Sequence, residues 1–299
     1  MDYNTVIIGS GVAGMTAAIY LGRANISTCI IEKEAPGGQI TRTSVIDNYP
    51  GFEKINGTDL AISMYNQVNS FKVPYLFTEV LEIISLEDKK IIKTKDKEIS
   101  CQNIIIATGR SPRKLNVEGE QKLIGRGVSY CAICDGALYK EKNIAVIGGG
   151  RAALEETLYL SKICNHITLI HRRDIFRAEN NLVDTVKSKE NVTVLTNTNV
   201  VEFVEKDNKL YSIKIKNKNN EIEELKVDGC FEYIGQVPNT ENFKNLDILD
   251  ENGYIIVDNN SETKIKGIYA IGDCIKKDLY QIITACSDGA VVANRIAKI

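Results

Sequence analysis

The strongest constraint on the fold is a pattern of residues that occurs twice in the chain. An apolar run at residues 5–8 leads into a glycine-rich turn at residues 9–14, and a helical run and a second apolar run at residues 27–31 follow. The same series returns at residues 144–147, at residues 148–153, up to residue 163, and at residues 166–170. A strand, a glycine-rich turn, a helix and a parallel strand form one βαβ unit. The sequence therefore predicts two α/β domains, each of which begins with this unit.

Each copy is followed by a segment typical of antiparallel strands. Apolar and charged residues alternate in short runs over residues 81–101 and again over residues 201–227. Both segments lead into apolar strand-like runs, at residues 104–107 and 231–235. The predicted fold class is α/β, with two Rossmann-like dinucleotide-binding domains of the three-layer ββα kind, each with a small antiparallel β insertion. The tail adds a hairpin-like stretch, a strand and a final helix, at residues 254–257, at residues 268–271 and from about Gln281.

Two short segments that contain proline mark the predicted domain boundaries. They surround Pro112 and Pro238, and they flank the second copy. The second copy is then a module inserted between two parts of the first. We predict that residues 1–113 and 239–299 form one domain and that residues 114–238 form the other.

The charge and composition of the chain argue against two classes of partner. A net charge of -2, scattered Lys and Arg residues and the absence of Trp do not fit a nucleic-acid surface. The uncharged stretch at residues 3–22 is not expected to span a membrane, because Gly9, Gly11 and Gly14 interrupt its apolar run and no basic segment precedes it. We expect neither nucleic acid nor membrane as a partner.

The cysteines indicate the compartment in which the protein works. The chain has 8 cysteines, and one pair alone is close in sequence. Most of the others lie in apolar strand-like or helix-like runs, where a thiol packs as a small hydrophobic group. This is not the disulfide framework of a secreted protein. We therefore predict a reducing compartment, the cytoplasm.

The first glycine-rich turn has the spacing of a dinucleotide-binding turn. Gly9 permits a tight turn, Gly11 lets the backbone approach a pyrophosphate, and Gly14 lets the helix and strand pack closely. The pyrophosphate then lies at the N-terminal end of the helix. Glu32 follows the second apolar run, where a carboxylate can accept hydrogen bonds from ribose hydroxyls. A solvated charge at the end of a strand is the alternative.

The second copy points to a different nucleotide. His171 occupies the position that Glu32 has in the first copy, and Arg172, Arg173 and Arg177 follow it. Guanidinium groups bind a 2′-phosphate through charge-assisted hydrogen bonds, whereas a carboxylate would repel it. The pattern favours NADP over NAD, unless the arginines form only a solvated face.

Two nucleotide folds in one chain indicate electron transfer between two cofactors. A flavin commonly connects such sites, because it accepts a hydride and can pass electrons to a disulfide. Gly272 and Asp273 follow an apolar strand-like run, where the carboxylate could hold the ribityl hydroxyls of a flavin. The last helix would point its N-terminus at the flavin ring.

Cys131 and Cys134 form the one Cys-x-x-Cys of the chain. This spacing permits a readily reduced disulfide and a thiolate with a lowered pKa. A structural zinc site would want four ligands, and the sequence has no second Cys-x-x-Cys and no suitably spaced His pair. We therefore predict no metal site. Asp135 is a candidate proton donor to a leaving thiolate, with a capping role as the alternative.

Over nearly its whole length the sequence resembles the low-molecular-weight thioredoxin reductases. The matching motifs occur in order at residues 9–14, 36–39, 48–52, 107–109, 125–129, 131–136, 148–150 with 155–156, 171–179, 234–235, 238–240, 272–273 and 281–290. The resemblance implies a homodimer that uses NADPH, FAD and the Cys131–Cys134 pair to reduce thioredoxin and to maintain the thiol balance of the cell. By analogy Cys134 faces the flavin, Cys131 attacks the disulfide of thioredoxin, and Asp135 is the acid.

The resemblance also implies which residues bind each cofactor. FAD would bind residues 1–113 and 239–299, and NADPH would bind residues 114–238. The residues expected at FAD are Gly9, Gly11, Gly14, Glu32, Gly38, Gln39, Asn48, Gly109, Gly272, Asp273, Gln281 and Ile282. The residues expected at NADPH are Gly148, Gly150, Ala153, His171, Arg172, Arg173 and Arg177.

Three departures from the family pattern leave some expectations open. Ala137 and Leu138 stand where the family often has two aromatics that grip thioredoxin, so the native protein acceptor is open. Tyr280 stands where an arginine commonly precedes the glutamine. Cys274 and Cys286 lie near the expected flavin site, and we interpret them as packing residues.

Two other functions remain as alternatives. One is a related flavin disulfide reductase that takes electrons from ferredoxin or reduces another thiol protein, such as a glutaredoxin-like or peroxidase-linked partner. The arginine cluster argues against ferredoxin as donor, since such an enzyme needs no nicotinamide site. The other is a non-catalytic binding protein whose flavin only reports NADPH, and the complete set of donor site, flavin site and dithiol argues against it.

Overall fold

The computed structural model of the protein describes residues 1–43 and 45–298. The contacts between Cα atoms divide the chain into two compact units. Unit 1 comprises Met1–Ser111 and Val237–Ile299, and unit 2 comprises Pro112–Gln236. The chain thus leaves unit 1, completes unit 2 and returns. The assignment of one unit to FAD and of the other to NADPH stays a prediction.

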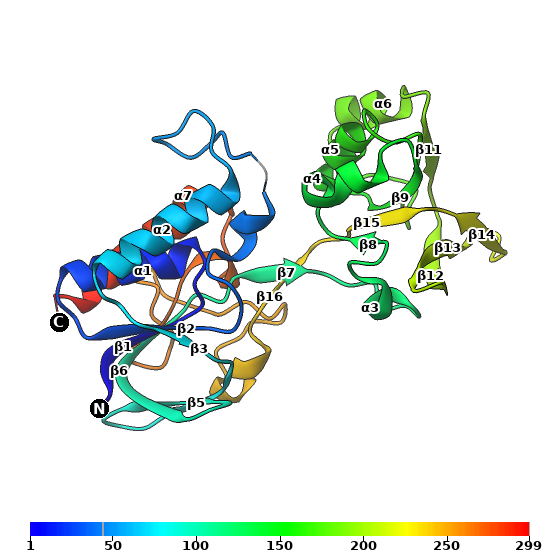
Figure 1. The fold of residues 1–299 in the computed structure, drawn as a ribbon. Coiled ribbons are helices and arrows are strands. Elements are labelled where there is room, and N and C mark those ends of the chain that lie inside the picture. The colour runs from blue at the N-terminus through cyan, green and yellow to red at the C-terminus, as the bar shows by residue number, and fades with distance from the viewer. Residues whose placement is uncertain (44, 299) are drawn as a thin grey trace. The chain divides into compact units, whose positions relative to one another are not determined.

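Unit 1 is built on a sheet in which the strand order is β3-β2-β1-β6-β5-β4, with β17 also paired to β6 (Figure 1). The parallel part consists of β1 (Tyr3–Ile8), β2 (Thr28–Glu32), β3 (Tyr75–Phe77), β6 (Glu98–Ile106) and β17 (Ile268–Ala270). Since β2 and β6 lie on opposite sides of β1, the strand order reverses there. In open α/β sheets, ligands bind at the carboxyl ends of the strands beside such a reversal.

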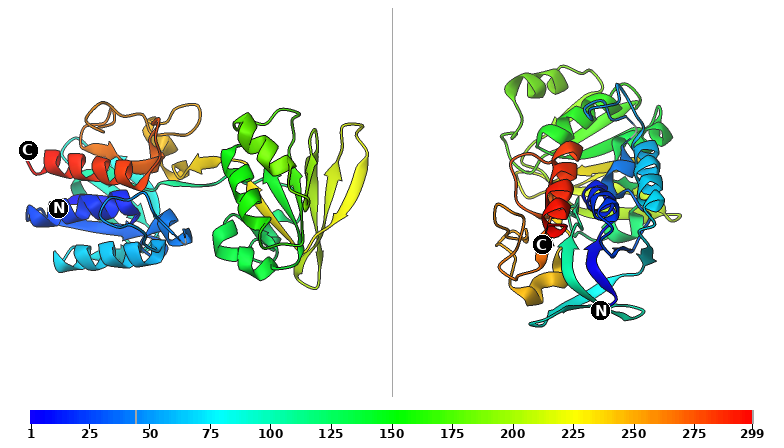
Figure 2. Two further views of the ribbon diagram at one scale, coloured as in Figure 1. Left: turned by 90° about the horizontal axis from the view of Figure 1, so that it is seen from above. Right: turned by 90° about the vertical axis from the view of Figure 1, so that its left-hand side faces the viewer.

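Helices cover one face of this sheet. They are α1 (Val12–Arg23), α2 (Gly57–Ser70) and α7 (Ile282–Ile296), and they lie side by side, with α1 in contact with both others (Figure 2). Alternate residues of β1 face opposite ways, as a strand requires. Ile7 belongs to the core under the helices, whereas Val6 and Ile8 belong to the core on the other face.

The other face of the sheet in unit 1 is covered by β4 (Val80–Ser85), β5 (Lys90–Thr94) and a 3₁₀ helix (Glu241–Leu246). The strand β6 joins the two parts of the sheet: its first residues pair antiparallel with β5, and its later residues pair parallel with β1. The hairpin-like stretch expected at residues 254–257 is present as a tight turn closed by one antiparallel bridge, between Leu249 and Ile255. The amide of Asp250 donates to the carbonyl of Tyr254, and the amide of Ile256 donates to the carbonyl of Ile248, both at 2.8 Å.

Unit 2 repeats the plan with the parallel strand order β11-β10-β9-β15-β8. The strands are β8 (Val128–Ser129), β9 (Asn143–Gly148), β10 (His166–Ile170), β11 (Val192–Leu195) and β15 (Gly229–Tyr233). One face packs on α5 (Arg151–Leu160) and α6 (Asn180–Lys187) through an apolar core that includes Val146, Leu154 and Val186. Two further elements have a single turn each, α3 (Glu120–Leu123) and α4 (Ala132–Asp135).

The other face of unit 2 packs on a separate antiparallel sheet. Its strands are β12 (Asn199–Lys206), β13 (Lys209–Lys216) and β14 (Ile222–Lys226), in that order. Phe203, Ile213 and Ile215 of this sheet share a core with Ile147 and Cys230 of the parallel sheet. Helices, a parallel sheet and an antiparallel layer therefore form three layers. The predicted fold class, with a small β insertion in each half, is confirmed.

Two strands carry the chain between the units, β7 (Arg110–Pro112) and β16 (Gln236–Pro238), and they pair with each other (Figure 1). Backbone hydrogen bonds also join the residues that flank these two strands. The amide of Asn239 donates to the carbonyl of Gly109 at 3.0 Å, and the amide of Arg113 donates to the carbonyl of Gly235 at 2.9 Å.

Candidate functional site

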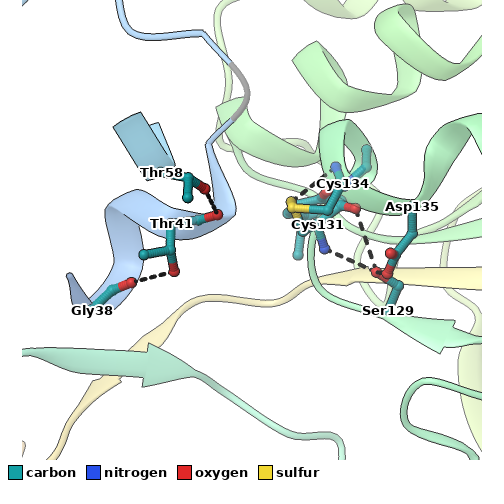
Figure 3. The surroundings of a disulfide bond; sticks show 9 residues. Gly38, Thr41, Thr58, Ser129, Cys131, Cys134 and Asp135 are labelled. Carbon is teal, nitrogen blue, oxygen red and sulfur yellow. Dashed lines mark hydrogen bonds between the residues drawn. A yellow bond between two sulfur atoms is a disulfide. The ribbon is translucent and has the colours of Figure 1, made fainter. Parts of the chain in front are cut away.

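A disulfide joins Cys131 and Cys134 in unit 2, at a Cα–Cα distance of 5.3 Å (Figure 3). Cys131 is the N-cap of α4, and the amide of Cys134 donates to Cys131 Sγ at 3.1 Å. A thiolate at Cys131 would receive the same N–H, and a donor at a helix N-terminus favours the ionised form of a cysteine. Cys134 is exposed and Cys131 is half-buried. The turn thus suits a dithiol in which one thiolate is stabilised.

Asp135 is held in place directly beside this disulfide. Ser129 Oγ donates to Asp135 Oδ2 at 2.7 Å, and the amide of Cys131 donates to Ser129 Oγ at 3.1 Å (Figure 3). The amide of Ala132 donates to the hydroxyl of Tyr233 on β15 at 2.7 Å. The sequence reasoning assigned no role to Ser129 or Tyr233, because their contacts with the turn arise only from the fold. These two residues fix the turn and the carboxylate next to it.

The first glycine-rich turn joins β1 to α1 in unit 1. Gly9 has a φ of +102°, which is strained for other residues, and a Cβ at Gly14 would lie 2.0 Å from the Gly9 carbonyl oxygen. No atom lies within 4 Å of a Cβ built on Gly11. Gly11 is also the N-cap of α1, where no side chain caps the helix. The turn therefore leaves main-chain amides beside open space, as a bound pyrophosphate needs.

Two loops border this turn. The amide of Gly37 donates to the Ser10 carbonyl at 2.8 Å, and a Cβ on Gly38 would lie 3.2 Å from the Cα of Gly11. Glu32 ends β2, and its carboxylate accepts the amides of Ser10 at 2.7 Å and of Glu34 at 2.9 Å. The structure thus brings the predicted residues Gly38 and Glu32 to the glycine-rich turn.

The loop after the 3₁₀ helix η1 (Gly38–Arg42) and the start of α7 meet at the same edge of unit 1. Asn48 Nδ2 donates to Gln281 Oε1 at 3.0 Å, and Gln281 forms a capping box with Thr284 at the start of α7. Ile282, the first residue of α7, packs against the core under the helices. Asn48, Gln281 and Ile282 therefore lie together.

A further group surrounds Arg110, directly after Gly109. Its guanidinium donates to Asp273 Oδ2 at 3.0 Å and lies 3.7 Å from the centre of the Tyr280 ring. Gln39 Nε2 donates to the carbonyl of Arg110 at 2.9 Å. The sequence reasoning missed Arg110, because an arginine after Thr-Gly has no distinctive spacing. Tyr280, which departs from the family pattern, supplies the face on which this guanidinium stacks.

Gly272 places Asp273 at the N-terminal end of α1. Gly272 has a φ of +73°, and a Cβ there would lie 3.0 Å from the Cβ of Ala13. Its amide donates to Asp288 Oδ2 at 2.9 Å, and Asp288 also pairs with Lys277. The predicted residues of unit 1 therefore converge on the carboxyl ends of β1, β2, β6 and β17.

Cys274 and Cys286 are both buried free thiols. Cys274 Sγ donates to the carbonyls of Ile271 at 3.2 Å and Ile106 at 3.4 Å, and burial raises its pKa to about 11. Cys286 Sγ lies 3.9 Å from the hydroxyl of Tyr49. Both positions are consistent with packing residues.

The second glycine-rich turn joins β9 to α5 in unit 2. A Cβ on Gly148 would lie 2.5 Å from the Tyr233 carbonyl oxygen and 2.7 Å from the Cβ of Ala153, which is buried. No atom lies within 4 Å of a Cβ built on Gly150, and no side chain caps α5 there. This turn has the same features as the first.

His171 lies under the second turn instead of projecting from it. It is 6% exposed, its Nε2 is 3.1 Å from the Ile175 carbonyl oxygen, and its ring stacks on Phe176 with 4.9 Å between centroids. A Cβ on Gly149 would lie 2.0 Å from the imidazole. Burial, the largest effect, lowers the pKa of His171, which keeps the ring neutral. His171 therefore supports the turn.

The three predicted arginines follow His171 at the end of β10. The amide of Arg177 donates to the carbonyl of Gly149 at 2.8 Å, which folds the segment back to the glycine-rich turn. Arg172, Arg173 and Arg177 are exposed. Among residues 1–43 and 45–298, none of their guanidinium groups forms an ion pair. They are free to bind an anion beside the turn.

Arg151 is a second basic residue that the sequence reasoning missed. It begins α5, and its guanidinium bonds Glu155 at 2.8 Å and Glu179 at 2.7 Å. The position of Arg151 directly after Gly148-Gly149-Gly150 could have indicated in the sequence that it lies at the glycine-rich turn. Because both carboxylates neutralise it, Arg151 fastens residue 179 to α5.

Neither a candidate metal site nor a helix that could cross a membrane is found in the described part of the chain. No group of three or more His, Cys, Asp and Glu residues there could hold a metal ion. None of the helices described is long and apolar enough to cross a bilayer.

The comparisons with known proteins agree with this geometry. The sequence model of the pyridine nucleotide-disulphide oxidoreductase family matches residues 3–289. The chain belongs to this family. Among curated members of this oxidoreductase family, the thioredoxin reductase of Bacillus subtilis (strain 168) is 42% identical over 295 residues, which is 98% of this chain and 93% of the relative.

Solved structures of the oxidoreductase family give the same result. Lactococcus lactis thioredoxin reductase has a TM-score of 0.88 and 42% identity, with 99% of this chain and 98% of that chain covered. A ferredoxin-flavin thioredoxin reductase from Clostridium acetobutylicum has a TM-score of 0.54 and 29% identity, with coverage of 99% and 97%. The resemblance to thioredoxin reductases is confirmed.

Proposed function

We propose that this protein is an NADPH-dependent thioredoxin reductase that contains FAD. The observation that carries the proposal is the Cys131–Cys134 disulfide with Asp135 fixed beside it, in a chain with two dinucleotide-binding turns. The 42% identity to the B. subtilis thioredoxin reductase over nearly the whole chain supports it. The ferredoxin-dependent alternative is not favoured, since unit 2 keeps a turn and an arginine cluster that suit NADPH.

The residues of unit 1 fit FAD. The turn at Gly9–Gly14 would hold the pyrophosphate, Glu32 the ribose, and Asp273 the ribityl chain. In the described structure Thr108 Oγ1 and Arg110 Nε are buried without a hydrogen-bond partner, so this edge has polar atoms for a ligand. When bound, the flavin accepts a hydride from NADPH and supplies two electrons to a disulfide.

Unit 2 fits NADPH. The turn around Gly150 would hold the pyrophosphate, with His171 as its support. Arg172, Arg173 and Arg177 would bind the 2′-phosphate through charge-assisted hydrogen bonds. A ribose without that phosphate would leave the guanidinium groups without their partner, which gives the preference over NADH.

The chemistry at the cysteines is disulfide exchange. Two electrons and one proton convert the Cys131–Cys134 disulfide into a thiolate and a thiol. The Cys131 thiolate, stabilised by the Cys134 amide, attacks one sulfur of the thioredoxin disulfide and forms a mixed disulfide, and the other thioredoxin sulfur leaves as a thiolate. Asp135 would give that thiolate a proton. Cys134 would return its proton to Asp135, and its thiolate then attacks Cys131 Sγ, restores the disulfide and releases thioredoxin as a thiol and a thiolate.

The resemblance supports two further parts of the proposal. We propose that the protein is a homodimer, which sedimentation of the purified protein tests. We also propose a cytoplasmic location, in which the protein maintains thiol balance. Buried free thiols at Cys29, Cys101, Cys164 and Cys230, besides Cys274 and Cys286, suit a reducing compartment.

The first test is an anaerobic titration of the purified protein with NADPH, followed by the visible spectrum of the flavin. Stoichiometric NADPH is expected to bleach the flavin, and NADH is expected to do so much less readily. A flavin that dithionite bleaches but NADPH does not would contradict the proposal in favour of ferredoxin as donor.

The second test separates the dithiol from the nucleotide sites. Cys131→Ser is expected to abolish turnover with thioredoxin and to leave reduction of the flavin by NADPH unchanged. Cys164→Ala is the matched control, because Cys164 is a buried free thiol of the same unit. Full turnover in the Cys131→Ser variant would refute the assignment.

A further inference from the structure

A buried carboxylate links the start of unit 2 to the turn that carries Cys131 and Cys134. Glu120, the first residue of α3, is 2% exposed. Its Oε1 accepts the Tyr130 hydroxyl at 3.0 Å and the Leu115 amide at 3.0 Å, and its Oε2 accepts the Asn116 amide at 2.5 Å. An ionised carboxylate has room for all of these donors. One side chain therefore binds two segments that are distant along the chain.

The two segments that Glu120 binds have functional neighbours. Leu115 and Asn116 follow Pro112, where unit 2 begins. Tyr130 directly precedes Cys131 and follows β8, which pairs with β15. Tyr130 is half-buried, and its ring makes the hydroxyl the end of a short rigid arm. Loss of this hydrogen bond would free the chain on the N-terminal side of the disulfide.

A second carboxyl group lies against the first. Glu232 of β15 is also 2% exposed, and its carboxyl group lies against that of Glu120. Burial, and next the charge of Glu120, raise the pKa of Glu232 to about 9. Two ionised carboxylates in contact would repel each other, which favours the neutral form of Glu232.

We propose that Glu120 is a positioning residue for disulfide exchange, which ties the Tyr130 hydroxyl to the main chain at Leu115 and Asn116 and so holds the Cys131–Cys134 turn. A tether that keeps two thiols close raises their effective concentration and favours the disulfide. The electrons and protons of the exchange are those of the reaction above. The proposal rests on the proposed function only for the identity of the protein acceptor.

The test removes the Tyr130 hydroxyl and keeps its ring. In the holoenzyme with the Tyr130→Phe change, the reduction potential of the pair is expected to become less negative. A tenfold loss of effective concentration corresponds to about 30 mV for a two-electron couple. With thioredoxin, kcat is expected to fall about tenfold while KM stays within about twofold, because the tether acts on the turn and not on docking. Reduction of the flavin by NADPH should not change.

The potential can be read without thioredoxin. Redox buffers and differential alkylation, followed by mass spectrometry of the tryptic peptide 127–140, report this pair alone, because its cysteines are Cys131 and Cys134. Tyr139→Phe is the matched control. Tyr139 is a half-buried tyrosine of the same unit, and its hydroxyl bonds no residue in the described structure.

The outcomes separate the two proposals. A Tyr130→Phe potential equal to that of the Tyr139→Phe control would overturn the role of Glu120. Glu120→Gln is the second variant, in which an amide nitrogen replaces one acceptor oxygen, and a shift in the same direction is expected. If the wild-type protein failed to reduce thioredoxin while Tyr130→Phe still shifted the potential, the positioning role would stand and the acceptor would be wrong.

Discussion

The buried pair of carboxyl groups in unit 2 makes a sharp prediction about stability. The pKa of Glu232 rises from the usual 4.5 to about 9 in the folded protein. Between these values the folded state keeps a proton that the unfolded state has lost. Stability from this group is therefore fully present below pH 4.5 and is lost as the pH rises toward 9. Glu232→Gln, which has the same shape and no charge, should remove this loss.

The magnitude follows from proton linkage. Each pH unit in the window contributes about 1.4 kcal/mol, so between pH 6 and pH 8 the wild-type protein should lose about 2.7 kcal/mol relative to Glu232→Gln. The amide of the variant also needs hydrogen-bond partners, which adds a difference in the free energy of unfolding that is constant at every pH. The buried acid is reported by the way in which the difference in the free energy of unfolding between wild type and Glu232→Gln changes with pH.

Urea unfolding at pH 6 and pH 8, with hydrogen exchange of β9 and β15 to follow unit 2 by itself, measures this difference. Glu190→Gln is the matched control, because Glu190 is an exposed carboxylate of the same unit. The difference in the free energy of unfolding between Glu190→Gln and the wild type should not change with pH. If the difference for Glu232→Gln were equally independent of pH, Glu232 would not be a buried neutral acid and this reasoning would be refuted.

Three further predictions concern the proposed cofactor and redox sites. Gly14→Ala puts a methyl group 2.0 Å from the Gly9 carbonyl oxygen, so it should destabilise unit 1 by about 1–3 kcal/mol and reduce the FAD bound per chain, read from the ratio of visible to ultraviolet absorbance. Replacing Arg172 and Arg173 with Gln should raise the KM for NADPH about 10- to 100-fold and leave that for NADH nearly unchanged, and equal losses for both would contradict the 2′-phosphate site. Asp135→Asn should lower thioredoxin turnover about 100-fold at unchanged flavin reduction by NADPH, and normal turnover would exclude the proton role.

The sequence predicted those features that local pattern encodes. The βαβ copies, the antiparallel segments after them and the final helix all follow from glycine spacing and from the period of apolar residues. Their positions agree with β1, α1, β9, α5 and α7. The hairpin-like stretch at residues 254–257 is present as a turn with a single antiparallel bridge at Ile255.

The sequence also could not show which contacts form between distant residues. Arg110 and Tyr233 contact Asp273 and Ala132, which are more than 100 residues away along the chain, and Ser129 contacts Asp135 through the local turn. His171 stood in the register of a nucleotide ligand, yet its ring is packed beneath Gly149. Whether the predicted site residues bind FAD and NADPH stays a prediction.

The sequence by itself determined the two nucleotide folds, the redox pair and the family resemblance, because each depends on residues that are close along the chain. The tertiary structure alone decided that Glu120 and Glu232 meet in the interior and that Glu120 binds Tyr130. These glutamates look like solvated charges in the sequence. Burial depends on which strands and loops cover a residue, and that is fixed only when β15, α3 and the start of unit 2 pack together.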